Sequence, residues 1–175
     1  MKETIYSIPI NDAFDEKNGC PMCRLYSDRC EKALDYITGA AMMEPDVRMQ
    51  SNKLGFCRQH LDIMLRTKKR LPVALMLESH LDDVSKNVYR SSKGAFSSSF
   101  DGDKLSQNAL NQASSCFVCQ RAQNENVHIT ENVIYMWKCD SAFQEKLRNQ
   151  EYFCLEHLSS LLKEAKKQLA KRDLA

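Results

Sequence analysis

One pattern of cysteine and histidine occurs twice along the chain, and it restricts the fold more than any other feature. The motifs are, in order, Cys20-Pro-Met-Cys23, Cys57-Arg-Gln-His60, Cys116-Phe-Val-Cys119 and Cys154-Leu-Glu-His157. Between the CxxC and the CxxH lie 33 residues in the first copy and 34 in the second. Two leucines follow each histidine at the same spacing, Leu61 with Leu65 and Leu158 with Leu162. This repetition of order, spacing and flanking residues predicts an internal duplication.

The residue types in these motifs are those that bind zinc. Side chains three positions apart on a helix face the same way, so each motif can aim two ligands at one ion. A Cys3His set suits tetrahedral Zn²⁺ and leaves no open position, and a helix N-terminus favours the thiolate. The equal spacing favours ligands from within one copy, although pairing between copies is an alternative. We predict two zinc ions, the first on Cys20, Cys23, Cys57 and His60 and the second on Cys116, Cys119, Cys154 and His157.

Other uses of the cysteines are less favoured. A CxxC at a helix start resembles the thioredoxin arrangement, but no βαβ pattern surrounds either motif and the CxxH pairs would be left unexplained. Iron–sulfur clusters are usually held by four cysteines. The two further cysteines, Cys30 and Cys139, do not correspond between the copies, and we expect them to be packing thiols. No motif pairs His80 or His128, and His80 is expected to pack against its neighbours.

Composition favours helices and disfavours several classes of protein. Glycine and proline together make up 9 of 175 residues, too few for a fold with many turns. The net charge of +2 does not favour nucleic-acid binding, although two basic clusters follow the CxxH motifs. No apolar run approaches the ~18 residues of a membrane span, and the N-terminus lacks the apolar core of a signal peptide. We therefore expect a cytoplasmic protein with reduced thiols and no membrane association.

The expected architecture is all-α, with two duplicated helical modules and a linker between them. Residues 1–90 would hold an N-terminal extended arm and the first module, because residues 5–10 resemble a strand without a partner. Residues 91–115 contain eight serines and are typical of a linker, and residues 116–175 would form the second module. The last helix is expected to begin near Phe153 and to turn five apolar side chains inward, namely Leu158, Leu161, Leu162, Ala165 and Leu169.

The chain also resembles a known family. The strings IYSIPINDAF, CPMCR, MEPDVR, GFCRQH, ALMLESHL, CFVC and FCLEH occur in an order similar to that of an uncharacterised bacterial domain-of-unknown-function family. The resemblance covers nearly the whole chain and implies a small cytoplasmic bacterial protein, without implying an activity. The second CxxC lacks the proline of CPMC, which concerns only the geometry of that helix start.

These observations favour a zinc-stabilised interaction, adaptor or regulatory protein with a protein partner over an enzyme. One alternative is a thiol-based redox or metal sensor, suggested by the number of cysteines. A second is an enzyme with a polar site at Glu44, Asp46 and Arg48, in a segment that has no counterpart in the second copy. These three residues could equally cap a helix. The sequence does not predict the oligomeric state.

Overall fold

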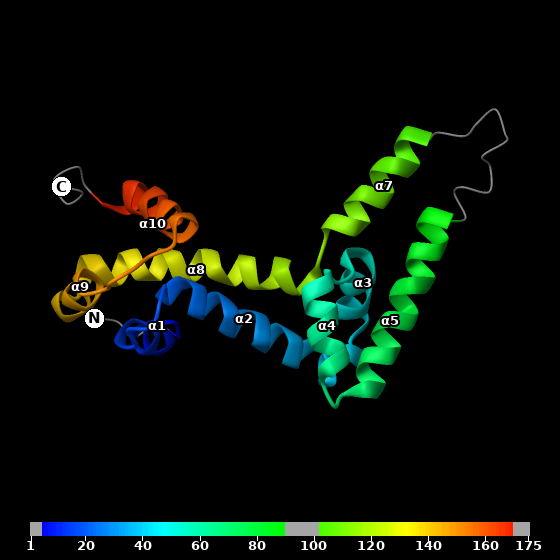
Figure 1. Ribbon diagram of the computed structural model, residues 1–175, viewed down its shortest axis with the longest axis horizontal. Helices are drawn as coiled ribbons and strands as arrows, with labels where there is room; N and C mark the ends of the chain where they lie inside the picture. The colour runs from blue at the N-terminus through cyan, green and yellow to red at the C-terminus, as the bar shows by residue number, and fades with distance from the viewer. Residues whose placement is uncertain (1–4, 90–101, 170–175) are drawn as a thin grey trace. The chain divides into compact units, whose positions relative to one another are not determined.

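Every regular element in the described part of the chain is a helix, which confirms the all-α prediction (Figure 1). The computed structural model describes residues 5–89 and 102–169. The chain forms two compact units, of which unit 1 comprises residues 1–29 and 122–175 and unit 2 comprises residues 30–121. Helices α2 (Pro21–Ile37) and α8 (Phe117–Cys139) each contribute residues to both units. Each unit therefore combines residues from both copies of the motif.

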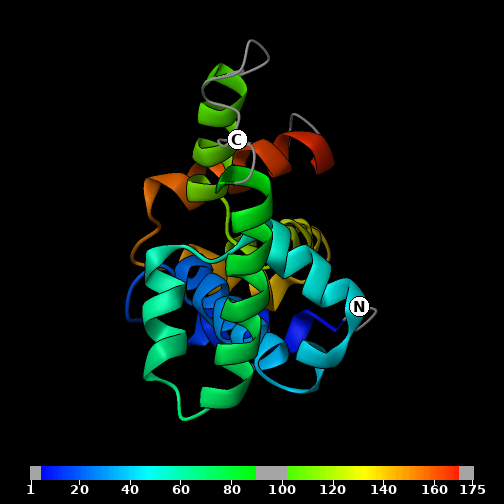
Figure 2. The same cartoon turned by 90° about the vertical axis from the view of Figure 1, so that its right-hand side faces the viewer.

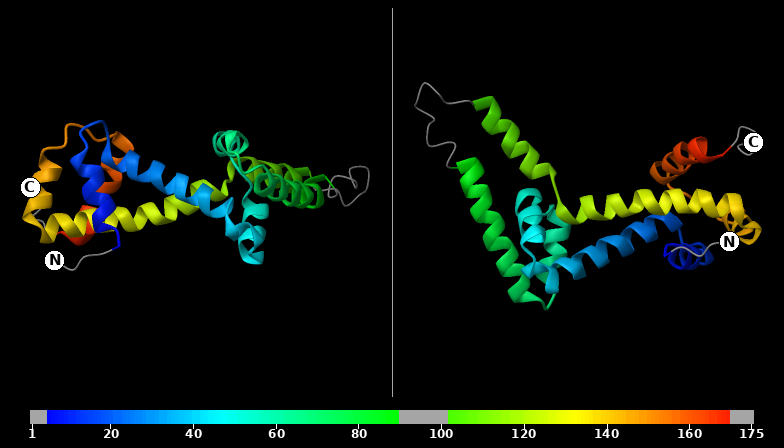
Figure 3. Two further views of the ribbon diagram at one scale, coloured as in Figure 1. Left: turned by 90° about the horizontal axis from the view of Figure 1, so that it is seen from below. Right: turned by 180° about the vertical axis from the view of Figure 1, so that it is seen from behind.

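Unit 1 is built from α1 (Ser7–Asp15), the first part of α2, most of α8, α9 (Ser141–Arg148) and α10 (Leu155–Gln168) (Figure 3). Its core includes Phe14 of α1 and Phe143 of α9, whose ring centroids are 5.0 Å apart. Asp140 caps α9, since its carboxylate accepts hydrogen bonds from the backbone N–H groups of residues 142 and 143. Cys20, the first cysteine of the first CxxC motif, is part of the same core.

The expected extended arm at the N-terminus is wrong, because residues 7–15 form helix α1. Ile10, Ala13 and Phe14 have the i, i+3, i+4 spacing of one helix face, and all three are buried in the unit 1 core. Pro9 lies in the first turn, where its missing N–H removes no intrahelical bond. The salt bridge from Lys146 to Asp15 and the hydrogen bond from Lys146 to Asn11 link α1 to α9.

Unit 2 contains the remaining helices, and α5 packs along α3 within it (Figure 2). After α2 the chain forms η1 (Ala40–Met43), α3 (Pro45–Leu54), α4 (Arg58–Arg66), α5 (Arg70–Val84) and the short π-helix η2 (Ser85–Tyr89). Most of the described part of the expected linker is also helical, as α7 (Gly102–Ser114). The serine-rich segment at residues 91–101 lies outside the described residues.

Helices α2 and α8 contact each other within each unit. In unit 1, Arg29 of α2 lies 3.7 Å from the carboxylate of Glu125, and Met22 shares the core with Val133. Residue numbers therefore rise along α2 as they fall along α8, which makes the two helices antiparallel in this unit. In unit 2, the guanidinium of Arg121 near the start of α8 lies over the ring of Tyr36 near the end of α2, 4.2 Å from its centroid.

Helix α10 leaves part of its apolar surface exposed, contrary to expectation. Leu161 and Ala165 are buried in the unit 1 core, as expected. Leu158 and Leu162 are instead exposed, and Leu155 adds to the same face with 85 % of its surface accessible. The helical period explains the difference, because Leu158 and Leu162 lie about 60–100° around the axis from Leu161. In the part of the chain that is described, no helix has the length and hydrophobicity needed to cross a membrane.

Candidate metal centres

Each of the four motifs is placed at the start of a helix, as the sequence predicts. The first cysteine of every motif immediately precedes the helix, and its carbonyl accepts a hydrogen bond from the first helical turn. Cys57 and Cys154 are the N-cap residues of α4 and α10 and have nearly the same backbone angles, φ −67° and ψ 159° against φ −68° and ψ 152°. The second ligand follows in the first turn. Both side chains of a motif therefore lie at the positive end of a helix dipole, which stabilises thiolates.

Site 1 combines the first CxxC with the last CxxH. Its four ligand atoms, from Cys20, Cys23, Cys154 and His157, all lie within 4.8 Å of one another. The Nδ1 atom of His157 is 3.8, 3.3 and 3.0 Å from the sulfurs of Cys20, Cys23 and Cys154. The sulfurs of Cys23 and Cys154 are 3.6 Å apart. Site 1 thus joins the N-termini of α2 and α10, both within unit 1.

Site 2 combines the two inner motifs in the same way. Its ligand atoms, from Cys57, His60, Cys116 and Cys119, also lie within 4.8 Å of one another. The Nδ1 atom of His60 is 3.2, 3.5 and 3.3 Å from the sulfurs of Cys57, Cys116 and Cys119. The sulfurs of Cys57 and Cys119 are 3.9 Å apart. Site 2 joins the N-termini of α4 and α8 within unit 2.

The eight expected ligands are therefore brought together, but the expected pairing within each copy is wrong. Cys20 and Cys23 meet Cys154 and His157 instead of Cys57 and His60, and each CxxC is matched with the CxxH of the other copy. The long helices provide the reason. At 1.5 Å per residue, the 17 residues of α2 carry the chain about 25 Å away from its CxxC. In unit 2 the end of α2 meets the start of α8, so the chain that leaves α2 reaches the second CxxC.

Gly55 positions the first CxxH beside the second CxxC. Its backbone, at φ 61° and ψ −155°, is in a region that almost only glycine adopts. Its carbonyl accepts a hydrogen bond from the backbone N–H of Phe117, at 2.9 Å. The preceding carbonyl, of Leu54, accepts one from the hydroxyl of Ser115, at 2.7 Å. These two bonds on either side of Cys116 hold the two halves of site 2 in register.

Burial and neighbouring groups shift the pKa values of three of the clustered cysteines. Partial burial and contacts with the thiols of Cys154 and Cys20 raise the pKa of Cys23 to about 12. Burial and the neighbouring Cys116 and Cys57 likewise raise the pKa of Cys119 to about 12. Burial also opposes ionisation of Cys20. Hydrogen bonds from backbone N–H groups, that of Cys154 first among them, outweigh this effect, so the pKa of Cys20 is lowered. Crowded thiols of this kind ionise readily only when a cation compensates the charge.

The imidazole of site 1 is set for metal binding. Burial lowers the pKa of His157 below its ordinary value, and the charge of Glu156 opposes the shift only in part. The ring is therefore neutral at pH 7, the form in which histidine binds metals. His157 gives up no proton when it becomes a ligand.

The remaining candidate residues lie outside both clusters. His80 packs against Phe56, with Nδ1 2.8 Å from the carbonyl oxygen of Asn52, as expected of a packing histidine. Cys30 is buried, as expected of a packing thiol, whereas the same expectation is wrong for Cys139, which is exposed at the end of α8. His128 is an exposed partner of Glu131 on the same helix.

The polar residues at the start of α3, Glu44, Asp46 and Arg48, do not form an enclosed site. Glu44 is the N-cap residue of α3 and accepts a hydrogen bond from Tyr36 at 3.3 Å. Glu44 and Asp46 are exposed, and Arg48 is half-buried. Asp46 lies in the first turn of α3, where its charge favours the helix dipole. The side chain of Glu44 makes no capping hydrogen bond to α3, so only the charge of Asp46 in the first turn supports the helix-capping interpretation.

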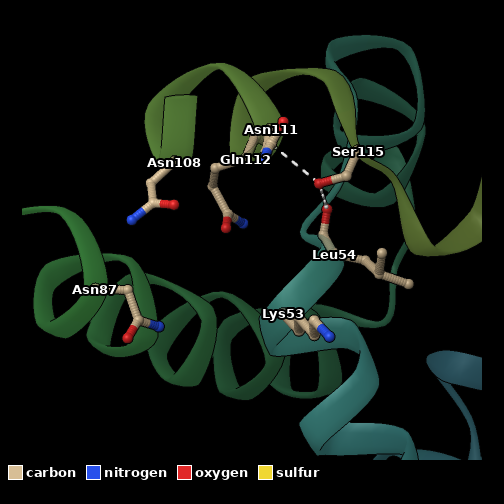
Figure 4. Close-up of a pocket in the computed structure, with 7 residues that line it drawn as sticks. All are labelled: Lys53, Leu54, Asn87, Asn108, Asn111, Gln112 and Ser115. Atoms are coloured by element: carbon tan, nitrogen blue, oxygen red, sulfur yellow. Dashed lines mark hydrogen bonds between the residues drawn. The ribbon is translucent and has the colours of Figure 1, made fainter. Parts of the chain in front are cut away.

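A polar cavity of about 450 Å³ lies close to site 2 in unit 2 (Figure 4). The side chains of Asn108 and Gln112 point into it, Asn87 also lines it, and Ser115 at its edge donates the hydrogen bond to Leu54 that flanks Cys116. The sequence did not indicate this cavity, because residues 91–115 have the composition of a linker. The density of amide side chains between residues 107 and 112 is the signal that could have indicated it.

Comparison with known proteins gives a family and no function. The whole chain, residues 1–175, matches the model of a family of unknown function (DUF6062). The chain belongs to this family. No curated protein and no solved structure is significantly similar to it. The expected membership of an uncharacterised family is thus confirmed, and the chemistry must be inferred from the two Cys/His clusters.

Proposed function

We propose that this protein binds two zinc ions, one in each cluster, and that the ions hold its helices together. The observation that carries the proposal is the geometry of the ligand atoms. A tetrahedral zinc ion, with Zn–S of about 2.3 Å and Zn–N of about 2.0–2.1 Å, separates its ligands by roughly 3.5–3.8 Å. The separations from histidine Nδ1 to sulfur are 3.0–3.8 Å in site 1 and 3.2–3.5 Å in site 2. Small side-chain rotations are enough to reach the coordination distances.

The donor set favours zinc, and it favours a structural role. Three thiolates and one imidazole are soft and borderline ligands that suit Zn²⁺ better than Mg²⁺ or Ca²⁺, which prefer oxygen. Four protein ligands fill the tetrahedron, so no position is left for a substrate or water. Each ion would join segments far apart in sequence, such as Cys23 and Cys154 or Cys57 and Cys119. Binding energy at such a site becomes folding energy.

Zinc content and its effect on folding test this proposal. We expect native mass spectrometry to give two zinc ions per chain, and we expect removal with a strong chelator to lower the midpoint of thermal unfolding. Cys30→Ser is the matched control, because it removes a buried cysteine that belongs to neither site and should leave two ions bound. Fewer than two ions per chain, or unchanged thermal unfolding after chelation, would contradict a structural role for zinc.

We further propose that the protein acts by binding a protein partner through α10. Leu155, Leu158 and Leu162 form an exposed apolar face, and the exposed Lys166 lies one turn after Leu162 on the same side. Exposed Lys163 adds a second positive charge nearby. An amphipathic helix with acidic flanks is complementary to this surface in both hydrophobicity and charge.

Substitutions on the exposed face test the partner proposal. The variant with Leu155→Glu and Leu162→Glu should fold and keep its zinc, because both side chains are exposed. It should also lose acidic partners that wild-type bait retains in quantitative pull-down experiments. Met49→Glu is the control. It also places a carboxylate at an exposed apolar position, on α3, and should retain these partners. Identical partner sets for the wild type and the α10 variant would show that this face is not the docking site.

A further inference from the structure

The two clusters are unequal in their exposure to solvent. In site 1, Cys23 is exposed and His157 is half-buried. In site 2, the corresponding Cys119 is half-buried and His60 is only 4 % exposed. A reagent in solution therefore has direct access to a ligand sulfur of site 1 and restricted access to those of site 2. Accessibility is one of the two properties that decide which cysteines are oxidised, the other being thiolate character.

The two clusters also differ in what holds them besides a metal. In site 2, the N–H of Phe117 donates to Gly55 and the hydroxyl of Ser115 donates to Leu54, so hydrogen bonds tie α8 to the segment before α4. The residue of site 1 that corresponds to Phe117 is Pro21, which has no N–H to donate. The proline that distinguishes CPMC from CFVC therefore removes a hydrogen-bond donor from site 1. In site 1 the N–H of Cys154 bonds to the sulfur of Cys20, but this bond uses a ligand atom itself, so loss of the ligands is less well resisted than in site 2.

From these two differences we infer that site 1 is a thiol-reactive site, at which a two-electron oxidant such as hydrogen peroxide modifies Cys23 first. Cys23 then forms a disulfide with Cys154, and site 1 releases its ion while site 2 keeps its own. This inference rests on the proposed zinc binding and adds a regulation to it. Bound to a cation, the Cys23 sulfur is a thiolate, which is the nucleophilic form.

The chemistry needs only the oxidant and two cysteines. The sulfur of Cys23 attacks one peroxide oxygen, the O–O bond breaks, and the products are a sulfenic acid and a hydroxide that becomes water on taking a proton. The sulfur of Cys154, which lies 3.6 Å from that of Cys23, then attacks the sulfur of the sulfenic acid. The S–S bond forms, the S–O bond breaks, and the second hydroxide leaves as water. Two thiolates, one peroxide and two protons from the solvent thus give one disulfide and two waters.

Loss of the site 1 ligands acts directly on α10. The disulfide withdraws two of four ligands, which leaves Cys20 and His157 as a weak pair. Without the ion, α10 keeps its core contacts through Leu161 and Ala165, and the Cys23–Cys154 disulfide replaces the metal as the link at its N-terminus. The exposed face with Leu155 begins at this terminus, so oxidation alters the surface that we propose for a partner.

The test follows zinc release and thiol mapping in the same sample. Zinc-loaded full-length protein carrying Cys139→Ser, which removes the exposed cysteine outside the sites, is treated with hydrogen peroxide. Released zinc is measured with a chromogenic chelator, and thiols are mapped by alkylation and peptide mass spectrometry. We expect one zinc to leave about tenfold faster than the other, together with a Cys23–Cys154 disulfide. Dithiothreitol with added zinc should restore both ions.

Matched variants show which site releases its zinc in the fast phase and which in the slow phase. Cys23→His should keep two ions, since histidine is also a zinc ligand, and should abolish the fast phase. Cys119→His should leave the fast phase in place. Release from site 2 first, release of both ions at one rate, or a Cys20–Cys23 disulfide would overturn the inference while leaving zinc binding intact. Fewer than two ions before any oxidant is added would instead contradict the proposed function itself.

Discussion

Replacing Gly55 by alanine tests how the first CxxH is held beside the second CxxC. The backbone at this position, with φ 61° and ψ −155°, is in a region that costs a side-chain-bearing residue about 1–3 kcal/mol. An added Cβ would also lie 2.6 Å from Cε1 and 2.8 Å from Nε2 of His80, so the ring must move. Its contact with the carbonyl of Asn52 is worth about 1 kcal/mol. We therefore expect Gly55→Ala to cost about 2–4 kcal/mol of folding free energy.

The assay is chemical unfolding of the zinc-loaded protein, followed by circular dichroism. Gly19→Ala is the matched control, because Gly19 also has a positive φ, 100°, but nothing lies within 4 Å of an added Cβ. The loss of folding free energy in Gly19→Ala therefore measures the cost of a positive φ alone, without a clash between the added Cβ and a neighbouring side chain. His80→Ala supplies the second comparison, since the clash in Gly55→Ala disappears when the ring is absent. The penalty of Gly55→Ala should then fall by about 1 kcal/mol in the His80→Ala background.

Two results would refute this reasoning. If Gly55→Ala is within about 0.5 kcal/mol of wild type, as an ordinary surface substitution is, the backbone region does not constrain the protein. If its penalty is unchanged in the His80→Ala background, the contact with the ring is not part of the cost. Either result would leave the register between Gly55 and Phe117 without the explanation given above.

Three further predictions concern the sites and one helix. Cys154→Ser should expose Cys20 and Cys23 of zinc-treated protein to alkylation while the thiols of site 2 stay protected; exposure of Cys116 and Cys119 instead would support pairing within each copy. Zinc affinity should fall as pH decreases, because Cys23 and Cys119 have pKa values near 12 before binding and must each lose a proton. Calorimetry in buffers of different ionisation enthalpy should therefore detect about one to three protons released per ion, and a value of zero would exclude thiolate binding. Asp140→Ala should lower the free energy of unfolding by about 1 kcal/mol, whereas Asp140→Asn, which can still cap α9, should cost much less.

The sequence allowed the cysteine and histidine residues of the two clusters and their local structure to be predicted, because both depend on short-range patterns. A CxxC or CxxH motif needs its two side chains on one helical turn, and all four motifs indeed begin helices. The pairing of motifs depends on long-range geometry instead. The nearly equal spacings of 33 and 34 residues are compatible with pairing within a copy and with pairing between copies, so they do not indicate which CxxH joins which CxxC. The lengths and contacts of α2 and α8 determine this pairing.

Other differences have similarly physical origins. Residues 5–10 alternate too little to define a strand, and the apolar spacing that forms α1 becomes clear only when Ala13 and Phe14 are included. The inward orientation expected of Leu158 and Leu162 failed because the apolar face of α10 is wider than the surface available to cover it. Periodicity identifies which residues share a face, but not whether the rest of the molecule covers that face.

The crossed pairing nests one closure inside the other, and this imposes an order on synthesis. All four residues of site 2 precede Cys154 in the chain, so that set leaves the ribosome before α10 does. Site 1 spans 131 positions from Cys23 to Cys154, and closing site 2 first roughly halves the chain that remains free between them. Each halving of a loop lowers the entropic cost of closure by only about 0.6 kcal/mol. The order in which the two sites close therefore depends mainly on the order in which their residues are synthesised. Site 1 can be completed only once translation has passed His157, and its closure therefore marks a chain that has been made through to the start of α10.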